Sequence, residues 1–312
     1  MKITSRFGIG AAAVLVAAMT PAISASLPGT AAAPARMVIT VRPSHVGAVP
    51  ETLEARDVTV LEGPNSIPAR VSGMRRLSGD LADMQLFLLL DDSTRSSSLG
   101  TQLSDLKALV KSLPATAQVG IGYMRNGTFG MTQPFTTDHE KAAAALRLPI
   151  SVPGENGSPY FALSDLAKHW PSKQATTRRT VLMLTDGVDR YYDMSTVDDP
   201  YVDAAVRDVV RQGIQVYPIY LRGAGRFGSG PLSTDFAQSR LIQVSEQSGG
   251  YSYFEAMTDP VTIQPFLKDF EQRLQNQYEV TFESAAKGFQ QVKVQVEMPG
   301  VKIDAPKSVW VR

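Results

Sequence analysis

The pattern of hydrophobic and polar residues changes twice along the chain. Residues 37–43, 57–63 and 69–77 alternate in polarity or are rich in β-branched residues, and Gly/Pro/Asn turns separate them, which predicts short strands. From residue 84, continuous apolar runs alternate with segments whose apolar residues recur at helical spacing. Alternating runs return after residue 278. The pattern therefore predicts a β region, an α/β region and a second β region.

The α/β region has a nearly continuous apolar run at residues 84–91, MQLFLLLD, which is typical of a central strand buried on both faces. Thr137 and Glu140 form a capping-box pattern before one of the expected helices. Further strands are expected at 117–125, 127–133, 180–187, 214–221 and 251–254, and helices at 99–113, 141–148, 160–170, 200–212, 239–250 and 259–277. This order predicts an α/β fold: a Rossmann-like, doubly wound, mostly parallel sheet with helices on both faces.

The second β region is expected to have strands at 278–282, 291–298 and 301–305. A chain that begins and ends with strands suggests an insertion. Our hypothesis is that residues 36–82 and 278–312 pack as one small flanking β domain, with residues 83–277 as the α/β domain set into it.

The N-terminus has the pattern of a secretory signal peptide, assigned to residues 1–33. Lys2 and Arg6 precede a short apolar run, and small residues follow with cleavage expected after Ala25 or Ala33. A buried helix and an uncleaved signal anchor are the alternatives. The chain has no cysteine, which excludes a lipoprotein anchor, disulfides and thiolate chemistry. We expect an exported protein of a bacterial periplasm or cell exterior, with no stable membrane anchor once the signal is cleaved.

The charged residues give no sign of a nucleic-acid partner. Lys and Arg total 31 against 30 Asp and Glu, so the formal net charge is +1. The three histidines, His45, His139 and His169, lack the spacing of metal ligands, so catalysis has little support. Residues 223–230 are glycine-rich and are expected to form a flexible loop on the rim of the binding edge. Residues 189–193 are expected to form either a recognition loop or a solvated connection.

Three oxygen-rich segments are expected at the carboxyl edge of the parallel sheet, where ligands bind in such folds. They are residues 91–96 (DDSTRS), 157–158 (GS) and 185–187 (TDG). Carboxylates and hydroxyls without imidazole or thiolate suit a hard divalent cation, Mg²⁺ in the first place.

These segments resemble the metal-ion-dependent adhesion site of von Willebrand factor A-type (VWA) domains, in which Asp-x-Ser-x-Ser, a later Thr and an Asp-Gly hold the ion. The resemblance implies Asp91, Ser93, Ser158 and Asp186 as metal ligands. It covers about residues 84–275, and the flanks are similar to the exported bacterial VWFA-related family. It implies a VWA fold and a non-enzymatic role, in which a protein partner offers a carboxylate to the bound metal.

The departure from the motif is Arg95, which stands at the position of the second serine. Its guanidinium could pair with Asp91 or Asp186 in place of the metal, or turn to solvent while water fills the third ligand position. A shift of the frame by one residue would instead supply Asp92, Thr94 and Ser96. The site is thus a functional divalent site, a degenerate metal-free site or a solvated strand end.

Three functions follow from these alternatives. The first is a protein-binding or adhesion module, and the second is a structural or assembly component of the cell envelope with a decayed site. A metal-assisted hydrolase that uses Asp91 and Asp186 is a distant third.

Overall fold

The computed structural model describes residues 32–45, 52–79, 83–155, 157–174, 178–192, 196, 198–223 and 230–312. The expected signal peptide, apart from its last residues, and most of the glycine-rich segment 223–230 lie outside the described residues. Ala32–Arg312 form one compact unit. Within the described residues, no helix combines the length and the apolar character that crossing a membrane requires.

The first of two sheets has five strands in the order β6-β5-β4-β7-β8. Its strands β4, β5, β7 and β8 are parallel, and β6 runs antiparallel at one edge. Their bounds are β4 (Met84–Asp91), β5 (Ala117–Arg125), β6 (Thr128–Thr136), β7 (Arg178–Thr185) and β8 (Ile214–Tyr220). Every residue of β4 is buried, because this strand lies in the middle of the sheet with neighbours on both sides. That position explains its continuous apolar run.

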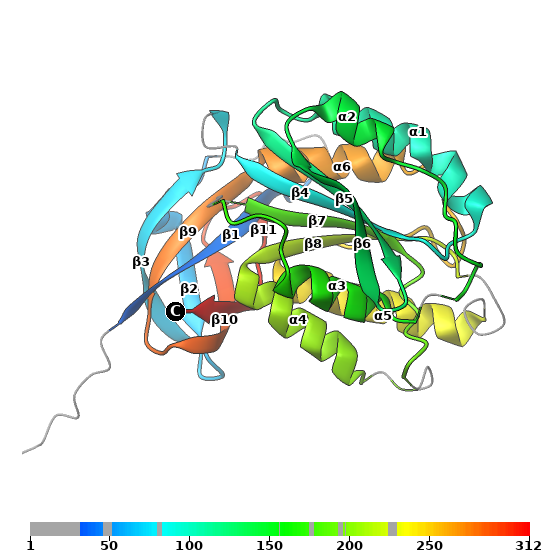
Figure 1. Ribbon diagram of the computed structural model, residues 1–312. Helices are drawn as coiled ribbons and strands as arrows, with labels where there is room; N and C mark the ends of the chain where they lie inside the picture. Colours follow the sequence, from blue (N-terminus) through cyan, green and yellow to red (C-terminus); the bar gives the residue numbers. More distant parts are fainter. Residues whose placement is uncertain are drawn as a thin grey trace, which may run out of the picture. The chain divides into compact units, whose positions relative to one another are not determined.

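Six helices cover this sheet, three on each face (Figure 1). One face carries α1 (Ser96–Ser112), α2 (His139–Ala144) and α6 (Gln264–Gln275), and the other carries α3 (Pro159–Lys168), α4 (Pro200–Gln212) and α5 (Pro231–Ser248). Each face of the sheet packs against its three helices in a separate hydrophobic core. Successive side chains of β4 point into the two cores alternately, so Leu88 packs in the first and Leu89 in the second. Burial of one such side chain contributes roughly 1.5–3 kcal/mol. The prediction of a mixed α/β chain with a mostly parallel sheet is confirmed.

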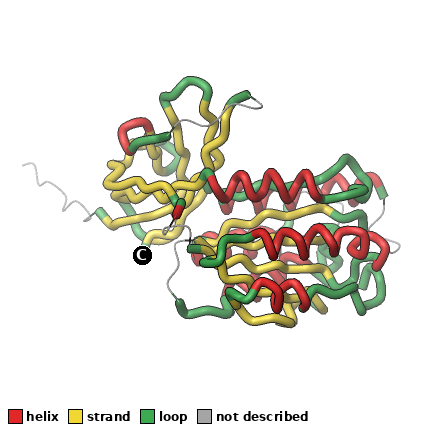
Figure 2. The backbone as a smooth tube through the Cα atoms, turned by 90° about the horizontal axis from the view of Figure 1, so that it is seen from above, coloured by secondary structure: helices red, strands yellow, loops and turns green. Residues whose placement is uncertain are grey.

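The second sheet is antiparallel and curled, with seven strands in the order β11-β1-β9-β3-β2-β10-β12. A single 3-10 turn, η1 (Ala55–Asp57), precedes β2. The strand bounds are β1 (Ala33–Pro43), β2 (Val58–Glu62), β3 (Ile67–Arg76), β9 (Gln277–Ser284), β10 (Gly288–Val296), β11 (Val301–Asp304) and β12 (Ser308–Val311). Strand β9, from the end of the chain, lies between β1 and β3 from its beginning. In Figure 2 these strands gather beside the helices rather than between them.

Several predicted element ends are wrong. Helix α2 is capped by Asp138, whose carboxylate accepts from Lys141 N at 3.0 Å, and not by Thr137. Helix α5 begins at Pro231, well before its apolar periodicity becomes visible. Proline is favoured at this position because the first amides of a helix have no intrahelical acceptor and proline has no N–H to leave unpaired. The expected strand at 251–254 is only a bridge from Tyr253 to β8, and the short strand β12 was not predicted.

Candidate functional site

Two neighbouring parallel strands end with polar residues that contact each other. Asp91 is the last residue of β4 and Thr185 the last of β7, and the Thr185 hydroxyl donates to Asp91 Oδ2 at 3.1 Å. The other oxygen, Oδ1, accepts from the amide and the hydroxyl of Ser93, each at 2.9 Å. Asp91 is only 2% exposed. The strand end therefore holds a buried carboxylate with hydrogen bonds to both oxygens.

The surroundings of Asp91 favour its protonated form. Burial and the nearby negative charge of Asp186 raise the pKa of Asp91 to about 6. The hydrogen bonds from Ser93 and the positive charge of Arg190 act in the opposite direction but are outweighed. A carboxylate with this pKa changes its charge just below neutral pH.

Arg190 supplies the positive charge at this edge. Its Nη2 lies 2.6 Å from Asp186 Oδ2, while Val188 N donates to Asp186 Oδ1 at 3.0 Å. The side chains of Arg190 and Asp186 are only 15% and 6% exposed, so the ion pair is largely shielded from water. Burial alone would lower the pKa of Arg190, but the charges of Asp186, Asp91 and Asp189 outweigh it and raise that pKa. A guanidinium thus lies among the carboxylates to which the resemblance assigns a metal.

Arg95 does not take this position. It precedes α1, its side chain is exposed, and no ion pair among the described residues joins it to Asp91 or Asp186. The interpretation in which Arg95 replaces the metal is therefore wrong, because Arg190 makes the contact with Asp186 instead.

Ser158 lies at the start of α3 and is fully buried. Its hydroxyl donates to Asp189 Oδ2 at 2.8 Å and accepts from Phe161 N at 3.3 Å, so the contacts of this hydroxyl are with Asp189 and the helix end. Burial raises the pKa of Asp189. The ring of Tyr191 lies against the adjacent Gly157, where a Cβ would be 2.1 Å from it. The loops after β7 and before α3 are thus packed together.

Asp92 faces a different set of partners. Its Oδ1 accepts from Arg147 Nη1 at 2.6 Å and from Ile150 N at 3.1 Å. Its Oδ2 is 3.3 Å from Arg147 Nη2 and 3.4 Å from the hydroxyl of Ser151. The backbone oxygen of Asp92 also accepts from Ser151 N at 3.2 Å. Asp92 therefore anchors the loop that follows α2.

Thr94 and Ser96, the other two residues of the shifted motif frame, do not join Asp92 in a metal site. The Thr94 hydroxyl donates to the backbone oxygen of Asp91 at 3.1 Å, and Ser96 is an exposed residue in the first turn of α1. Because Asp91 and Asp92 point into separate networks, the two frames do not share one site. Asp91, Ser93, Asp186 and, through Asp189, Ser158 are the members that the structure brings to one edge.

As arranged, these residues fit a guanidinium better than a divalent cation. Mg²⁺ needs near-octahedral oxygen ligands at about 2.0–2.1 Å. Here the carboxylate of Asp186 is already in contact with Arg190, while that of Asp91 accepts hydrogen bonds from Ser93 and Thr185. A divalent cation on both carboxylates would lie beside that guanidinium and be repelled by it.

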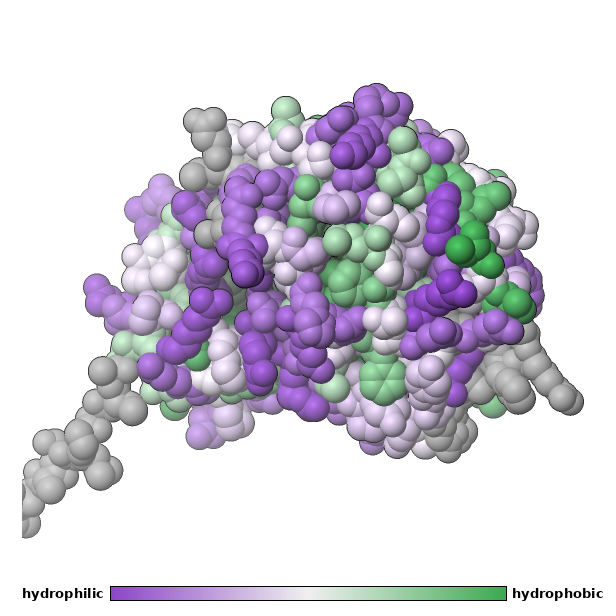
Figure 3. Space-filling model, viewed as in Figure 1, coloured by the Kyte–Doolittle hydropathy of each residue, from purple (hydrophilic) through white to green (hydrophobic). Residues whose placement is uncertain are grey.

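Exposed apolar side chains lie beside the site, on the loop that Asp92 anchors. Leu148, Ile150 and Val152 are 46%, 68% and 58% exposed. Figure 3 shows hydrophobic side chains gathered at the end of the molecule where the parallel strands finish, on the right of the view. A cavity of about 260 Å³ between this loop and the end of β5 is lined by Ser93, Met124, Arg125, Asn126, Ile150, Ser151, Val152 and Glu155. We call the sheet edge with Asp91, Asp186 and Asp189 the acidic edge, and the exposed side chains of Leu148, Ile150 and Val152 beside it its apolar rim.

Sequence reasoning missed the two arginines that organise the site. Arg190 was assigned only to a recognition loop or a solvated connection, although its position four residues after Asp186 was a usable signal. Arg147 carried no signal, because its partner Asp92 is distant in the sequence.

Comparison with known proteins gives fold likenesses only. No family model matches the chain, and no curated protein matches it. Among solved structures, an aerotolerance-related membrane protein from Bacteroides fragilis is 15% identical, over 61% of this chain and 98% of that one, with a TM-score of 0.43. The pilus adhesin SpaC from Lactobacillus rhamnosus GG is 9% identical over 87% and 49% of the two chains, with a TM-score of 0.46. The VWA domain of SpRpn10 is 10% identical over 60% and 94%, with a TM-score of 0.38. Likenesses this weak carry no argument about function, which has to come from the chain's own residues.

Proposed function

We propose that the chain is an exported, non-enzymatic VWA-type module that binds a protein partner at the carboxyl edge of its parallel sheet, without a bridging metal. One observation carries the proposal: apolar side chains are held exposed on an anchored loop beside the acidic edge. Export rests on the signal-peptide pattern of residues 1–33.

The anchored loop has the properties of a protein-binding surface. Ile150 and Val152 expose apolar surface next to a polar site, an arrangement that marks interaction surfaces when the residues are contiguous. Asp92 and its backbone fix the loop through Arg147 and the amides of Ile150 and Ser151. A surface that is ordered before binding loses less entropy when the partner docks.

The ion pair between Arg190 and Asp186 supports the metal-free form of this proposal. The guanidinium neutralises the charge of Asp186, one of the two carboxylates that a divalent cation at this edge would have to bind. For the same reason a metal-assisted hydrolase that uses Asp91 and Asp186 is disfavoured. A VWA-type site with Mg²⁺ on Asp91, Ser93, Ser158 and Asp186 is the competing form, and the experiment below separates the two.

The test compares partner capture by variants of the full chain. Ile150→Asp combined with Val152→Asp places charges on the apolar rim, and Ile67→Asp on strand β3, at a position 59% exposed, is the matched control. Each protein is immobilised, exposed to cell-envelope extract with and without EDTA, and the retained proteins are quantified by mass spectrometry.

We expect a protein that is retained by the wild type and by Ile67→Asp, is lost from the double variant, and is unaffected by EDTA. Equal retention by the double variant would refute binding at this edge. Loss of the same protein in EDTA, restored by Mg²⁺, would refute the metal-free form and support a bridging ion.

A further inference from the structure

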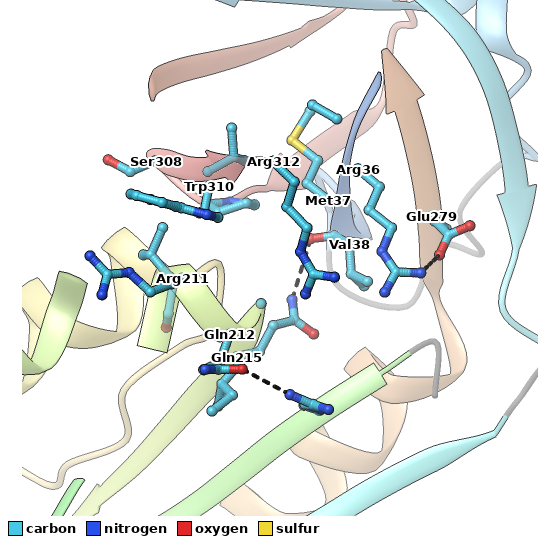
Figure 4. A pocket seen from close by; sticks show the side chains of 18 of the residues that line it. Arg36, Met37, Val38, Arg211, Gln212, Gln215, Glu279, Ser308, Trp310 and Arg312 are labelled. Carbon is cyan, nitrogen blue, oxygen red and sulfur yellow. Dashed lines mark hydrogen bonds and ion pairs between the residues drawn. The ribbon is translucent and has the colours of Figure 1, made fainter. Parts of the chain in front are cut away.

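A second site lies at the opposite end of the parallel strands. A cavity of about 510 Å³ opens between the antiparallel sheet and the start of β8, with lining residues from β1, β12 and the end of α4 (Figure 4). Arg179, near the start of β7, lines it, whereas Thr185 at the end of the same strand belongs to the acidic edge. At the rise of a β-strand the two sites are about 20 Å apart.

The described residues that line this cavity are strongly basic. Five of them are positively charged: Lys173, Arg36, Arg179, Arg211 and Arg312. The single acidic residue, Glu279, is shared, because its Oε1 accepts from Arg75 at 2.9 Å, outside the lining, and its Oε2 is 3.7 Å from Arg36. The whole chain has a formal net charge of only +1, so the cluster does not reflect a generally basic surface.

Two guanidinium groups of the cavity, those of Arg179 and Arg211, contact neutral partners, whereas Arg36 lies 3.7 Å from the carboxylate of Glu279. Arg179 donates to Gln212 Oε1 at 3.1 Å, and Arg211 lies 4.6 Å from the centre of the Trp310 ring. The side chains of Arg36 and Arg312 reach from β1 and from the end of β12 into the same part of the cavity (Figure 4). Burial and the positive charges of Arg312 and Arg36 lower the pKa of Arg179, in agreement with the positions of both groups near Arg179 in the lining of the cavity.

We propose that this cavity binds a small, soluble anion that carries one or more phosphate groups, held by Arg36, Arg179 and Arg312. Guanidinium forks form paired, charge-assisted hydrogen bonds with phosphate oxygens. The cavity volume lies in the range of small-molecule sites. This site is independent of the partner-binding edge proposed above.

The arginines could instead have a purely structural role. Helices α4 and α5 end at this cavity, and positive charges stabilise the carboxyl ends of helices. In that case the arginine substitutions would lower the stability of the chain, and no saturable anion binding would be found. The two explanations therefore make different predictions for a binding experiment.

The experiment titrates the full chain with inorganic pyrophosphate by calorimetry and by tryptophan fluorescence. Trp310 lines the cavity and reports on it directly, and Trp170, outside the lining, reports through Arg179, which lies 5.7 Å from its ring. The test variant is Arg36→Gln with Arg312→Gln. The matched control is Arg56→Gln with Arg70→Gln, which removes the same charge from side chains that are 79% and 77% exposed.

We expect saturable binding with one ion per chain, weakened by about a hundredfold in the cavity variant, since two arginines are removed and each lost charged hydrogen bond is worth about one decade of affinity. The control variant should bind like the wild type. Absence of saturable binding, or equal weakening in both variants, would overturn the proposal. So would binding to phosphatidylglycerol vesicles that the cavity variant loses while pyrophosphate shows none, because the ligand would then be a membrane surface.

Discussion

The buried carboxylate of Asp91 should make the stability of this chain fall as the pH rises. In the folded state its pKa is raised from 3.8 to about 6, while in the unfolded chain it returns to the ordinary value. Between these two values the folded state binds more protons than the unfolded state. The free energy of unfolding therefore decreases as pH rises through this window, and the loss is complete above the folded pKa.

The size of the effect follows from the shift. A difference of about two pKa units corresponds to roughly 3 kcal/mol, and roughly 2 kcal/mol is the safer figure because Asp91 is coupled to Asp186 and Arg190. Asp91→Asn removes the titration and keeps an oxygen to accept from Ser93. Its amide group can donate to the Thr185 hydroxyl, which already accepts from Gly187 N at 3.2 Å.

The measurement is urea denaturation of wild type and Asp91→Asn at a series of pH values from acid to mildly alkaline. The stability of the variant minus that of the wild type should rise by roughly 2 kcal/mol across the window and then level off. Asp235→Asn removes an exposed carboxylate from α5 and is the control for a general charge effect. A difference that is flat with pH, or that falls, would refute the burial argument.

Three further substitutions test the other parts of the structure. Arg190→Gln leaves Asp186 buried without its ion pair, so the chain should lose roughly 2–4 kcal/mol. Its melting temperature should then rise with MgCl₂ more than that of the wild type, and an equal response would contradict the guanidinium's role. Asp92→Asn should weaken the loop anchor by about 1–3 kcal/mol. Hydrogen exchange should then be faster at the amides of Ile150 and Ser151, and unchanged rates would refute the anchor. Leu88→Ala in the middle of β4 should cost roughly 2–5 kcal/mol in urea denaturation, and a cost below that range would argue against a closely packed core.

The regular elements were predictable where a long stretch of the sequence carries the apolar pattern of its buried residues. Strand β4 was predicted with its observed bounds, because all its residues are buried and its apolar run has sharp ends. Helix α5 was predicted only in its second half, because the residues that its first turns bury, Thr234 and Ala237, are polar or small and give no apolar periodicity. Strand β12 is four residues long, too short for alternation to be recognised.

The site was predictable where it follows from strand order and unpredictable where it depends on loops. The carboxyl ends of adjacent parallel strands share one edge, so the sequence could bring Asp91, Thr185 and Asp186 together. Periodicity does not tell where a long flexible side chain ends in a loop. For that reason the sequence suggested Arg95, which breaks the motif, as the cation that pairs with Asp186, whereas Arg190 makes this contact.

The contact of Arg190 with Asp186 is a consequence of the backbone after β7 as well as of the side chain. Gly187 has a φ of +66°, and a Cβ there would lie 2.8 Å from Leu241, so the chain turns sharply at a position that requires glycine. The Arg190 amide then donates to the backbone oxygen of Gly157 at 2.7 Å, which fixes the loop and directs the guanidinium back to the strand end. Restoring the motif serine at position 95 would leave this turn and its cation unchanged. The metal-free site that we propose therefore depends on the loop after β7. The replacement of the motif serine by Arg95 is not its cause.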